Sequence, residues 1–69
     1  MKTKKTYDVH FNDDQDSNSK GFEYTLQEAI EYIKAWNGTN YSYFGDYKSG
    51  MASVVCNETG EIYYEEIIK

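Results

Sequence analysis

Apolar and polar positions follow a helical period over one part of the chain, residues 25–37. The apolar residues there have the i, i+3, i+4, i+7 spacing of a single helix face, and they are Leu26, Ala29, Ile30 and Ile33. Thr25, with Glu28 three residues later, has the spacing of a capping box, in which each side chain accepts a backbone N–H at the helix start. Gly38 follows Asn37, where a left-handed residue commonly ends a helix. The pattern predicts one amphipathic helix over 25–37.

Before the helix, the apolar positions alternate with a period of two. Tyr7, Val9 and Phe11 fall on one side of an extended segment, and Asp8 and His10 fall on the other. This predicts a strand that adds its three apolar side chains to the core. The segment 21–24 either returns as a short antiparallel partner or forms no strand, and the residues leave both readings open.

After the helix, three strand-like runs cover residues 41–47, 51–57 and 61–68. They are separated by two three-residue turns that end in Gly50 and Gly60, a form typical of hairpins with a glycine bulge. This turn length predicts that Asn57 lies opposite Glu61 and Tyr47 opposite Met51, with successive rows on alternate faces. One face has a small aliphatic centre that suits the helix. The other face has no second layer to cover it and carries Tyr41, Tyr43, Tyr47, Val55, Tyr63 and Ile67.

These elements predict an α+β fold in a single small domain of 69 residues, 1–69. One amphipathic helix packs on one face of a mainly antiparallel sheet of four or five strands, in the order β-(β)-α-β-β-β. Chains this short have small cores, so a second subunit that covers more apolar surface would add stability.

Charge and composition exclude several classes of function. The net charge is −5 and the chain has no arginine, whereas nucleic-acid binding requires a basic surface, so no nucleic-acid partner is expected. No apolar run approaches the roughly 18 residues of a membrane span, and the basic start lacks the apolar segment of an export signal. We therefore expect a cytoplasmic protein without a membrane partner.

The acidic stretch 12–19 partly matches a calcium-binding loop. Asn12, Asp14, Asp16 and Glu23 have the spacing of four oxygen ligands, but Ser17 occupies the position that requires glycine. No helix precedes the loop, and its residue types are those of any solvated turn. The interpretation is a solvated loop, and no metal site is expected.

No catalytic site is predicted. His10 faces away from the core beside Asp8 and has no evident nucleophile, while Cys56 lies mid-strand on the core face, where a thiol is inert. One cysteine and one histidine cannot supply four zinc ligands. We expect no enzyme activity, no cofactor and no small-molecule substrate.

The uncovered tyrosine face is the best candidate for function. Tyrosine combines a large apolar ring with a hydroxyl that tolerates water, which suits protein interfaces, although such residues also serve cross-strand pairing alone. Glu61 and Glu65 lie beside the rings and repel phosphate. We expect a non-enzymatic protein-interaction or accessory module that binds a protein partner or itself as a homodimer. The alternative is an acidic inhibitor that mimics nucleic acid toward a basic partner.

Overall fold

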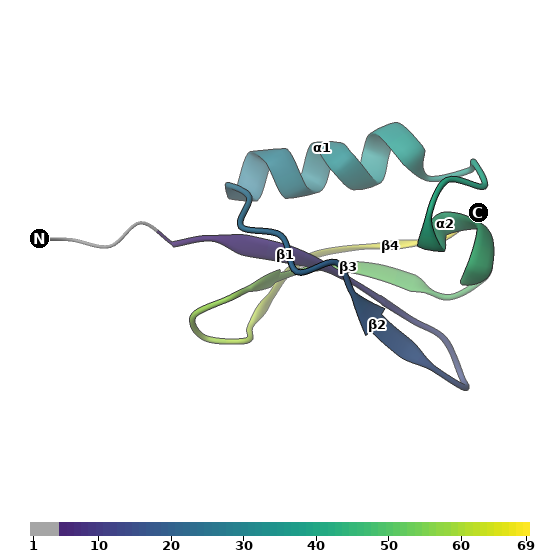
Figure 1. The fold of residues 1–69 in the computed structure, drawn as a ribbon, viewed down its shortest axis with the longest axis horizontal. Coiled ribbons are helices and arrows are strands. Elements are labelled where there is room, and N and C mark those ends of the chain that lie inside the picture. The colour runs from purple at the N-terminus through teal and green to yellow at the C-terminus, as the bar shows by residue number, and fades with distance from the viewer. Residues whose placement is uncertain (1–4) are drawn as a thin grey trace, which may run out of the picture.

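A computed structural model describes residues 5–69 and shows an α+β fold (Figure 1). The strands β1 (Tyr7–Asn12), β2 (Ser17–Ser19), β3 (Met51–Cys56) and β4 (Ile62–Ile67) form one antiparallel sheet in the order β2-β1-β3-β4. The main helix α1 (Leu26–Trp36) lies along one face of this sheet, over β1 and β3. The predicted class and the helix-on-sheet layering are confirmed. Residues 1–4, part of the start of the chain in which no export signal is expected, lie outside the described residues.

The helix α1 begins and ends as its sequence predicts. Thr25 is the N-cap and forms the capping box with Glu28, with donor–acceptor distances of 3.1 and 2.9 Å. Ala29 and Ile33 are fully buried against the sheet. Gly38 has φ +94°, the left-handed conformation that glycine adopts without strain. No helix within residues 5–69 has the length and apolar character needed to cross a membrane.

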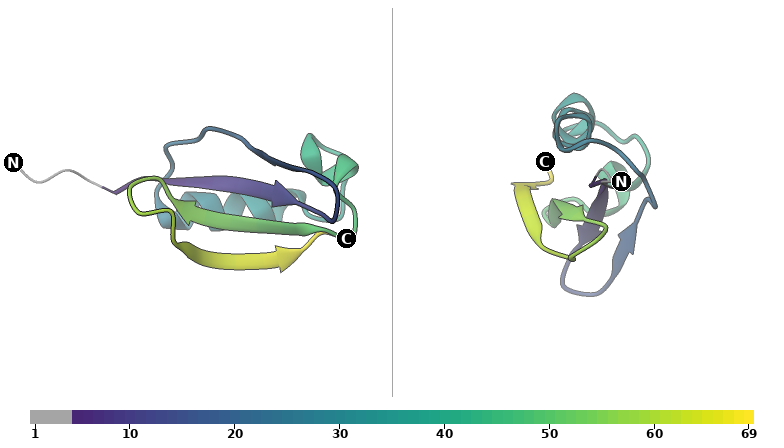
Figure 2. Two further views of the ribbon diagram at one scale, coloured as in Figure 1. Left: turned by 90° about the horizontal axis from the view of Figure 1, so that it is seen from below. Right: turned by 90° about the vertical axis from the view of Figure 1, so that its left-hand side faces the viewer.

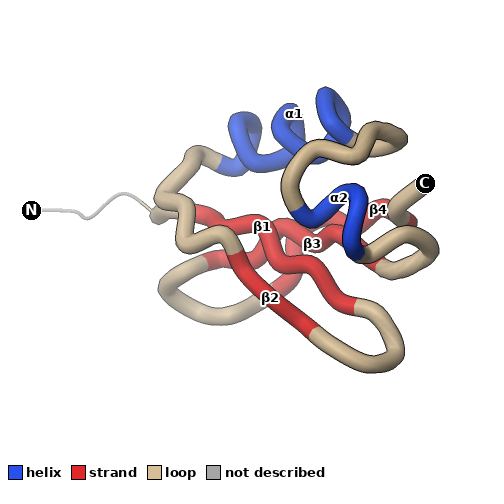
Figure 3. Tube along the Cα trace, turned by 45° about the vertical axis from the view of Figure 1, so that its right-hand side comes forward, coloured by secondary structure: helices blue, strands red, loops and turns tan. Residues whose placement is uncertain are grey.

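The prediction that residues 41–47 form a strand is wrong. They contain the short helix α2 (Tyr43–Asp46), at the end of the sheet where β1 ends and β3 begins (Figure 3). The place beside β3 is taken by β1, with Val9 opposite Val54. This pairing joins segments 45 residues apart, and local alternation contains no information about it. Phe44 and Tyr47 instead have the i, i+3 spacing of a helical turn and are buried against Phe11.

The predicted pairing of the last two strands is right at one end and shifted at the other. Met51 lies opposite Ile67 and Val54 opposite Tyr64, as expected. A bulge then places Val55 opposite Ile62, so the predicted pair of Val55 with Tyr63 is not formed. Cys56, rather than Asn57, donates to the Glu61 carbonyl, at 2.9 Å. The bulge moves Ile62 to the face of the sheet away from α1.

The loop predicted over residues 12–19 is shorter in the structure. Its last three residues form β2, which pairs with β1, so residues 13–16 alone connect the two strands. Asp13 accepts hydrogen bonds from the backbone N–H groups of Gln15 and Asp16, at 2.9 and 2.8 Å. The open question about residues 21–24 is also answered: Tyr24 alone forms an isolated antiparallel bridge, with Tyr7.

The sheet has two distinct faces. The side under α1 is the core, where Val9, Phe11, Ala52, Val54 and Cys56 are fully buried. Within the described residues, the side away from α1 has no helix or strand packed on it (Figures 1 and 2), and we call it the open face, although Asp8, Ser53 and Val55 on it are buried. By strand alternation and pairing it carries Asp8, His10, Asn12, Met51, Ser53, Val55, Ile62, Glu65 and Ile67.

Candidate functional site

The six residues of the predicted tyrosine face do not share one surface. Tyr47 is buried and Tyr43 is half-buried, and both rings pack on Phe11 because this segment is not a strand. Tyr63 packs edge-on against Tyr7, at 5.4 Å between ring centroids, because of the bulge. Val55 and Ile67 are on the open face. The common face predicted from the register is therefore wrong, although Tyr41 and Tyr63 are exposed.

A different group of aromatic residues forms a continuous series of contacts along α1. Phe22 stacks on Tyr24, with centroids 4.2 Å apart, and meets Tyr32 of α1 edge-on at 5.0 Å. Tyr32 reaches Tyr41 at 6.4 Å, and Tyr41 stacks on Trp36 at 4.2 Å. All five rings are exposed or partly exposed. We call this series the aromatic strip: Phe22, Tyr24, Tyr32, Trp36 and Tyr41.

The exposed end of the strip is the stacked pair of Trp36 and Tyr41. Their side chains keep 39% and 48% of their surface exposed, and their ring planes are 25° apart. Thr39 fixes the turn between them, since its N–H and its hydroxyl both donate to the Trp36 carbonyl, at 3.0 and 2.7 Å. The Thr39 hydroxyl also accepts the Tyr41 N–H at 3.1 Å. The pair is therefore held in place before any contact with a partner.

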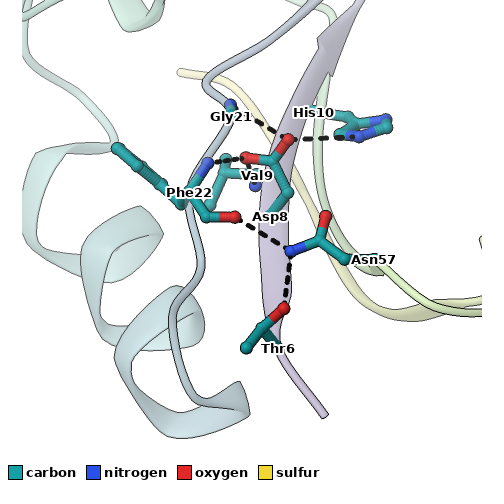
Figure 4. A network of polar contacts seen from close by, with 7 residues as sticks. All are labelled: Thr6, Asp8, Val9, His10, Gly21, Phe22 and Asn57. Carbon is teal, nitrogen blue, oxygen red and sulfur yellow. Dashed lines mark hydrogen bonds and ion pairs between the residues drawn. The ribbon is translucent and has the colours of Figure 1, made fainter.

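The other end of the strip is positioned by a polar network (Figure 4). Asp8 is 4% exposed, and its carboxylate accepts the N–H of Phe22 at 2.9 Å and that of Gly21 at 3.0 Å. The Asn57 amide donates to the Phe22 carbonyl and to the Thr6 hydroxyl, both at 2.9 Å. Both backbone polar groups of Phe22 are thus bound by side chains from strand and turn. This fixes the Phe22 backbone relative to the sheet.

Tyr24 and Tyr32 are held by the backbone and by packing. Tyr24 exchanges two backbone hydrogen bonds with Tyr7, at 2.7 and 3.0 Å. Tyr32 contacts the buried Phe44 at 5.6 Å between centroids, and burial raises the pKa of its hydroxyl while Ser42 opposes that rise. Tyr32 therefore stays neutral at physiological pH and contributes an uncharged ring to the strip.

One cation lies beside the strip. The Lys20 ammonium is 5.0 Å from the centroid of the Tyr43 ring and 5.9 Å from that of Phe22. It also donates to the Ser42 hydroxyl at 2.7 Å. These contacts hold the side chain against its own protein, so it contributes little to a basic surface for phosphate.

His10, Asp8 and Cys56 have partners within the protein. His10 Nε2 lies 3.6 Å from the Asp8 carboxylate, and Ser19 and Ser53 are its cross-strand neighbours. Asp8 is already bound to three backbone N–H groups, since it also accepts that of Val9 at 2.7 Å. Cys56 is buried, and hydrogen bonds from Thr59 lower the pKa of its thiol. Within residues 5–69, no three metal-ligating side chains are grouped at one place.

Comparison with known proteins finds no matching family model, no matching curated protein and no matching solved structure. The assignment of function therefore depends on this geometry. Sequence reasoning missed the stack of Trp36 on Tyr41, because Trp36 flanks the helix stripe and residues 41–47 have the alternation of a strand. It also missed the role of Asp8, because the backbone N–H groups that Asp8 binds belong to the irregular segment before α1, which no periodic pattern predicts.

Proposed function

We propose that the chain is a small, non-enzymatic, cytoplasmic module that binds a protein partner through the aromatic strip. The observation that carries the proposal is the exposed, prearranged stack of Trp36 on Tyr41. Tryptophan and tyrosine dominate the energetics of protein interfaces, because each buries a large ring and retains a polar group for the rim. Rings already fixed lose less conformational entropy on binding.

The charges of the chain favour a protein over a nucleic acid as this partner. Stacking of bases on aromatic rings normally occurs in a basic groove. Here the net charge is −5, and Lys20 is already in contact with Tyr43 and Ser42. An aromatic strip in acidic surroundings suits a partner with an apolar patch and basic margins.

Affinity capture tests the proposal. Tagged wild type is compared with Trp36→Ala and Tyr41→Ala in lysates of the cells that produce the chain, with Tyr63→Ala as a control. Tyr63 is 44% exposed and lies outside the aromatic strip, so its replacement removes a similarly exposed aromatic side chain elsewhere. Removing an interface anchor should weaken retention of a specific partner about tenfold or more, while the control retains it. Equal retention by all four proteins would refute docking through the strip.

Self-binding is examined with the same four proteins by sedimentation velocity. If the partner is a second copy, wild type and Tyr63→Ala sediment as dimers and the two strip variants as monomers. Circular dichroism spectra identical to that of wild type show that a variant is folded. Tyr43→Glu is unsuitable here, because Tyr43 packs on Phe11 and its replacement would disturb the core.

A second candidate function, an acidic inhibitor that occupies the nucleic-acid site of a basic protein, has one observation in its favour. Within residues 5–69, Asp8 with His10 is the one pairing of a carboxylate with a basic nitrogen at 4.0 Å or less. The other carboxylates of the described residues thus form no ion pair, and those that accept no hydrogen bond within the protein are available to a cationic partner. Repeating the capture at high salt distinguishes the two functions, because salt abolishes retention by an acidic mimic and spares an aromatic interface.

A further inference from the structure

The two edges of the sheet differ in how they are protected. β2 is one edge, and its three residues, Ser17–Ser19, are polar and too few to recruit another strand. β4 is the other edge, with six residues, Ile62–Ile67, and within residues 5–69 no helix or strand lies along its outer side (Figure 2). The strand contains no lysine and no proline, residues that commonly block an exposed edge.

The backbone of β4 presents hydrogen-bonding groups at this edge. Ile68 uses its N–H and its carbonyl toward Gly50 and Ser49, at 2.9 Å each, on the inner side. Because the backbone N–H and carbonyl groups of successive residues in a strand point to alternate sides, Ile67 and Glu65 direct these groups outward. In agreement, the Ile67 carbonyl accepts from the Asn37 amide, at 3.0 Å, rather than from β3. The Ile67 N–H and both groups of Glu65 therefore face outward, where a further strand would pair.

The side chains along this edge combine aliphatic surface with one negative charge. Ile62 and Ile67 are 56% and 64% exposed, and both lie on the open face with Glu65. Glu65 has a weak contact of 3.5 Å with the Ser53 hydroxyl and no lysine within ion-pair distance among residues 5–69. A strand added here would meet Ile67, Glu65 and then Ile62 on one face.

A second copy of the chain is a poor occupant. Antiparallel pairing of β4 with itself about Glu65, whose backbone groups face outward, would place this carboxylate opposite its own symmetry mate. Like charges directly opposite in a sheet are destabilising, and each chain has a net charge of −5. Charge complementarity favours a cationic strand.

We propose that the outer edge of β4 binds an extended segment of a partner protein by strand addition. The segment has a lysine or arginine opposite Glu65 and an aliphatic residue opposite Ile67. Its main chain pairs with the outward groups of Glu65 and Ile67, and its basic side chain neutralises Glu65. This surface is separate from the aromatic strip and does not depend on the function proposed for it.

The experiment titrates the ¹⁵N-labelled chain with a synthetic peptide, Thr-Val-Thr-Lys-Thr-Val, acetylated and amidated at its ends. The amide signals of Glu65 and Ile67 should shift and exchange more slowly with deuterium, while that of Trp36 stays unchanged. A peptide with glutamate in place of lysine should bind about tenfold more weakly, because it repels Glu65. A peptide N-methylated at the lysine should also lose binding, since it has lost a main-chain donor.

Two variants separate a local charge effect from a general one. Glu65→Lys should reverse the preference between the lysine and glutamate peptides, whereas Glu58→Lys, the same charge change in the exposed β3–β4 turn, should preserve it. If the amide signals of β4 do not shift at a peptide concentration of about 1 mM, the binding free energy is weaker than roughly 4 kcal/mol and the proposal is overturned. Equal binding of the N-methylated peptide, or concentration-dependent shifts in β4 without peptide, would also overturn it, the latter in favour of a second copy.

Discussion

Asp8 shows at the scale of one residue how a charge is held in the interior of this small protein. The residue is 4% exposed, and its carboxylate accepts hydrogen bonds from three backbone N–H groups, those of Val9, Gly21 and Phe22. Buried carboxylates are tolerated when such donors replace water. The sequence places Asp8 correctly on the side away from the core residues, but its partners come from a loop whose path no periodicity describes.

Replacing Asp8 with alanine should therefore be costly. The Gly21 and Phe22 amides lose their acceptor, and we expect the free energy of unfolding to fall by about 2 kcal/mol. Urea unfolding measures the change, with Asp14→Ala as the control, because Asp14 is exposed in the β1–β2 loop. If both variants lose the same stability, the network is not what fixes Phe22.

At the scale of elements, the end of α1 is tied to β4 through Glu66. The Glu66 carboxylate accepts from the Asn37 amide at 2.8 Å and from the Tyr64 hydroxyl. Burial raises the pKa of Glu66, but these hydrogen bonds and the charges of Lys34 and Lys69 outweigh burial and lower it below its ordinary 4.5. The charged form is thus favoured in the folded state.

This pKa shift sets the sign of a pH dependence. A carboxyl group whose pKa is lower in the folded protein stabilises it fully above the unfolded value of 4.5, and this contribution disappears as the pH falls through the folded value. Glu66→Gln should be less stable than wild type at neutral pH, and the difference should shrink below 4.5. Urea unfolding of both proteins as a function of pH measures this difference in the free energy of unfolding. A difference that is constant with pH would show that the charge of Glu66 is unimportant.

The elements differ in how far their sequence specifies them. Residues 25–37 contain the stripe, the capping box and the terminal glycine, and all three local signals agree with the helix that forms. In residues 41–47, tyrosines at alternate positions imitate a strand, while Phe44 and Tyr47 have helical spacing. Packing on Phe11, far away in the sequence, decides between these patterns. The aromatic strip could not be predicted for the same reason, since it joins a loop, a helix and the segment after it.

At the scale of the whole molecule, the charges are poorly compensated. Lys48 donates to the carbonyl groups of Thr39 and Lys69, and Lys34 lies over the Tyr64 ring at 5.7 Å, so these lysines contact no carboxylate at 4.0 Å or less within the described chain. With a net charge of −5, repulsion among the carboxylates opposes compaction.

Added salt should therefore stabilise the fold. Between low and physiological ionic strength, screening weakens repulsion over distances of about 10 Å, and Tm should rise. Differential scanning calorimetry measures the Tm at each salt concentration. Sucrose at equal osmolarity is the control, because it tests whether exclusion of the solute from the protein surface would raise the Tm without screening charges. Glu58→Lys, which makes the chain less acidic, should show a smaller rise. A Tm independent of salt in both proteins would contradict the repulsion.

The strand order β2-β1-β3-β4 also determines when the protein can fold during its synthesis. β1 leaves the ribosome well before its central partner β3, which ends at Cys56. Until that segment emerges, the apolar side of β1 has only the short hairpin with β2 and the helix to cover it. A nascent chain that has emerged only as far as residue 50 can contain a formed α1 and the β1–β2 hairpin but lacks β3, so the core is completed only after β3 has left the ribosome.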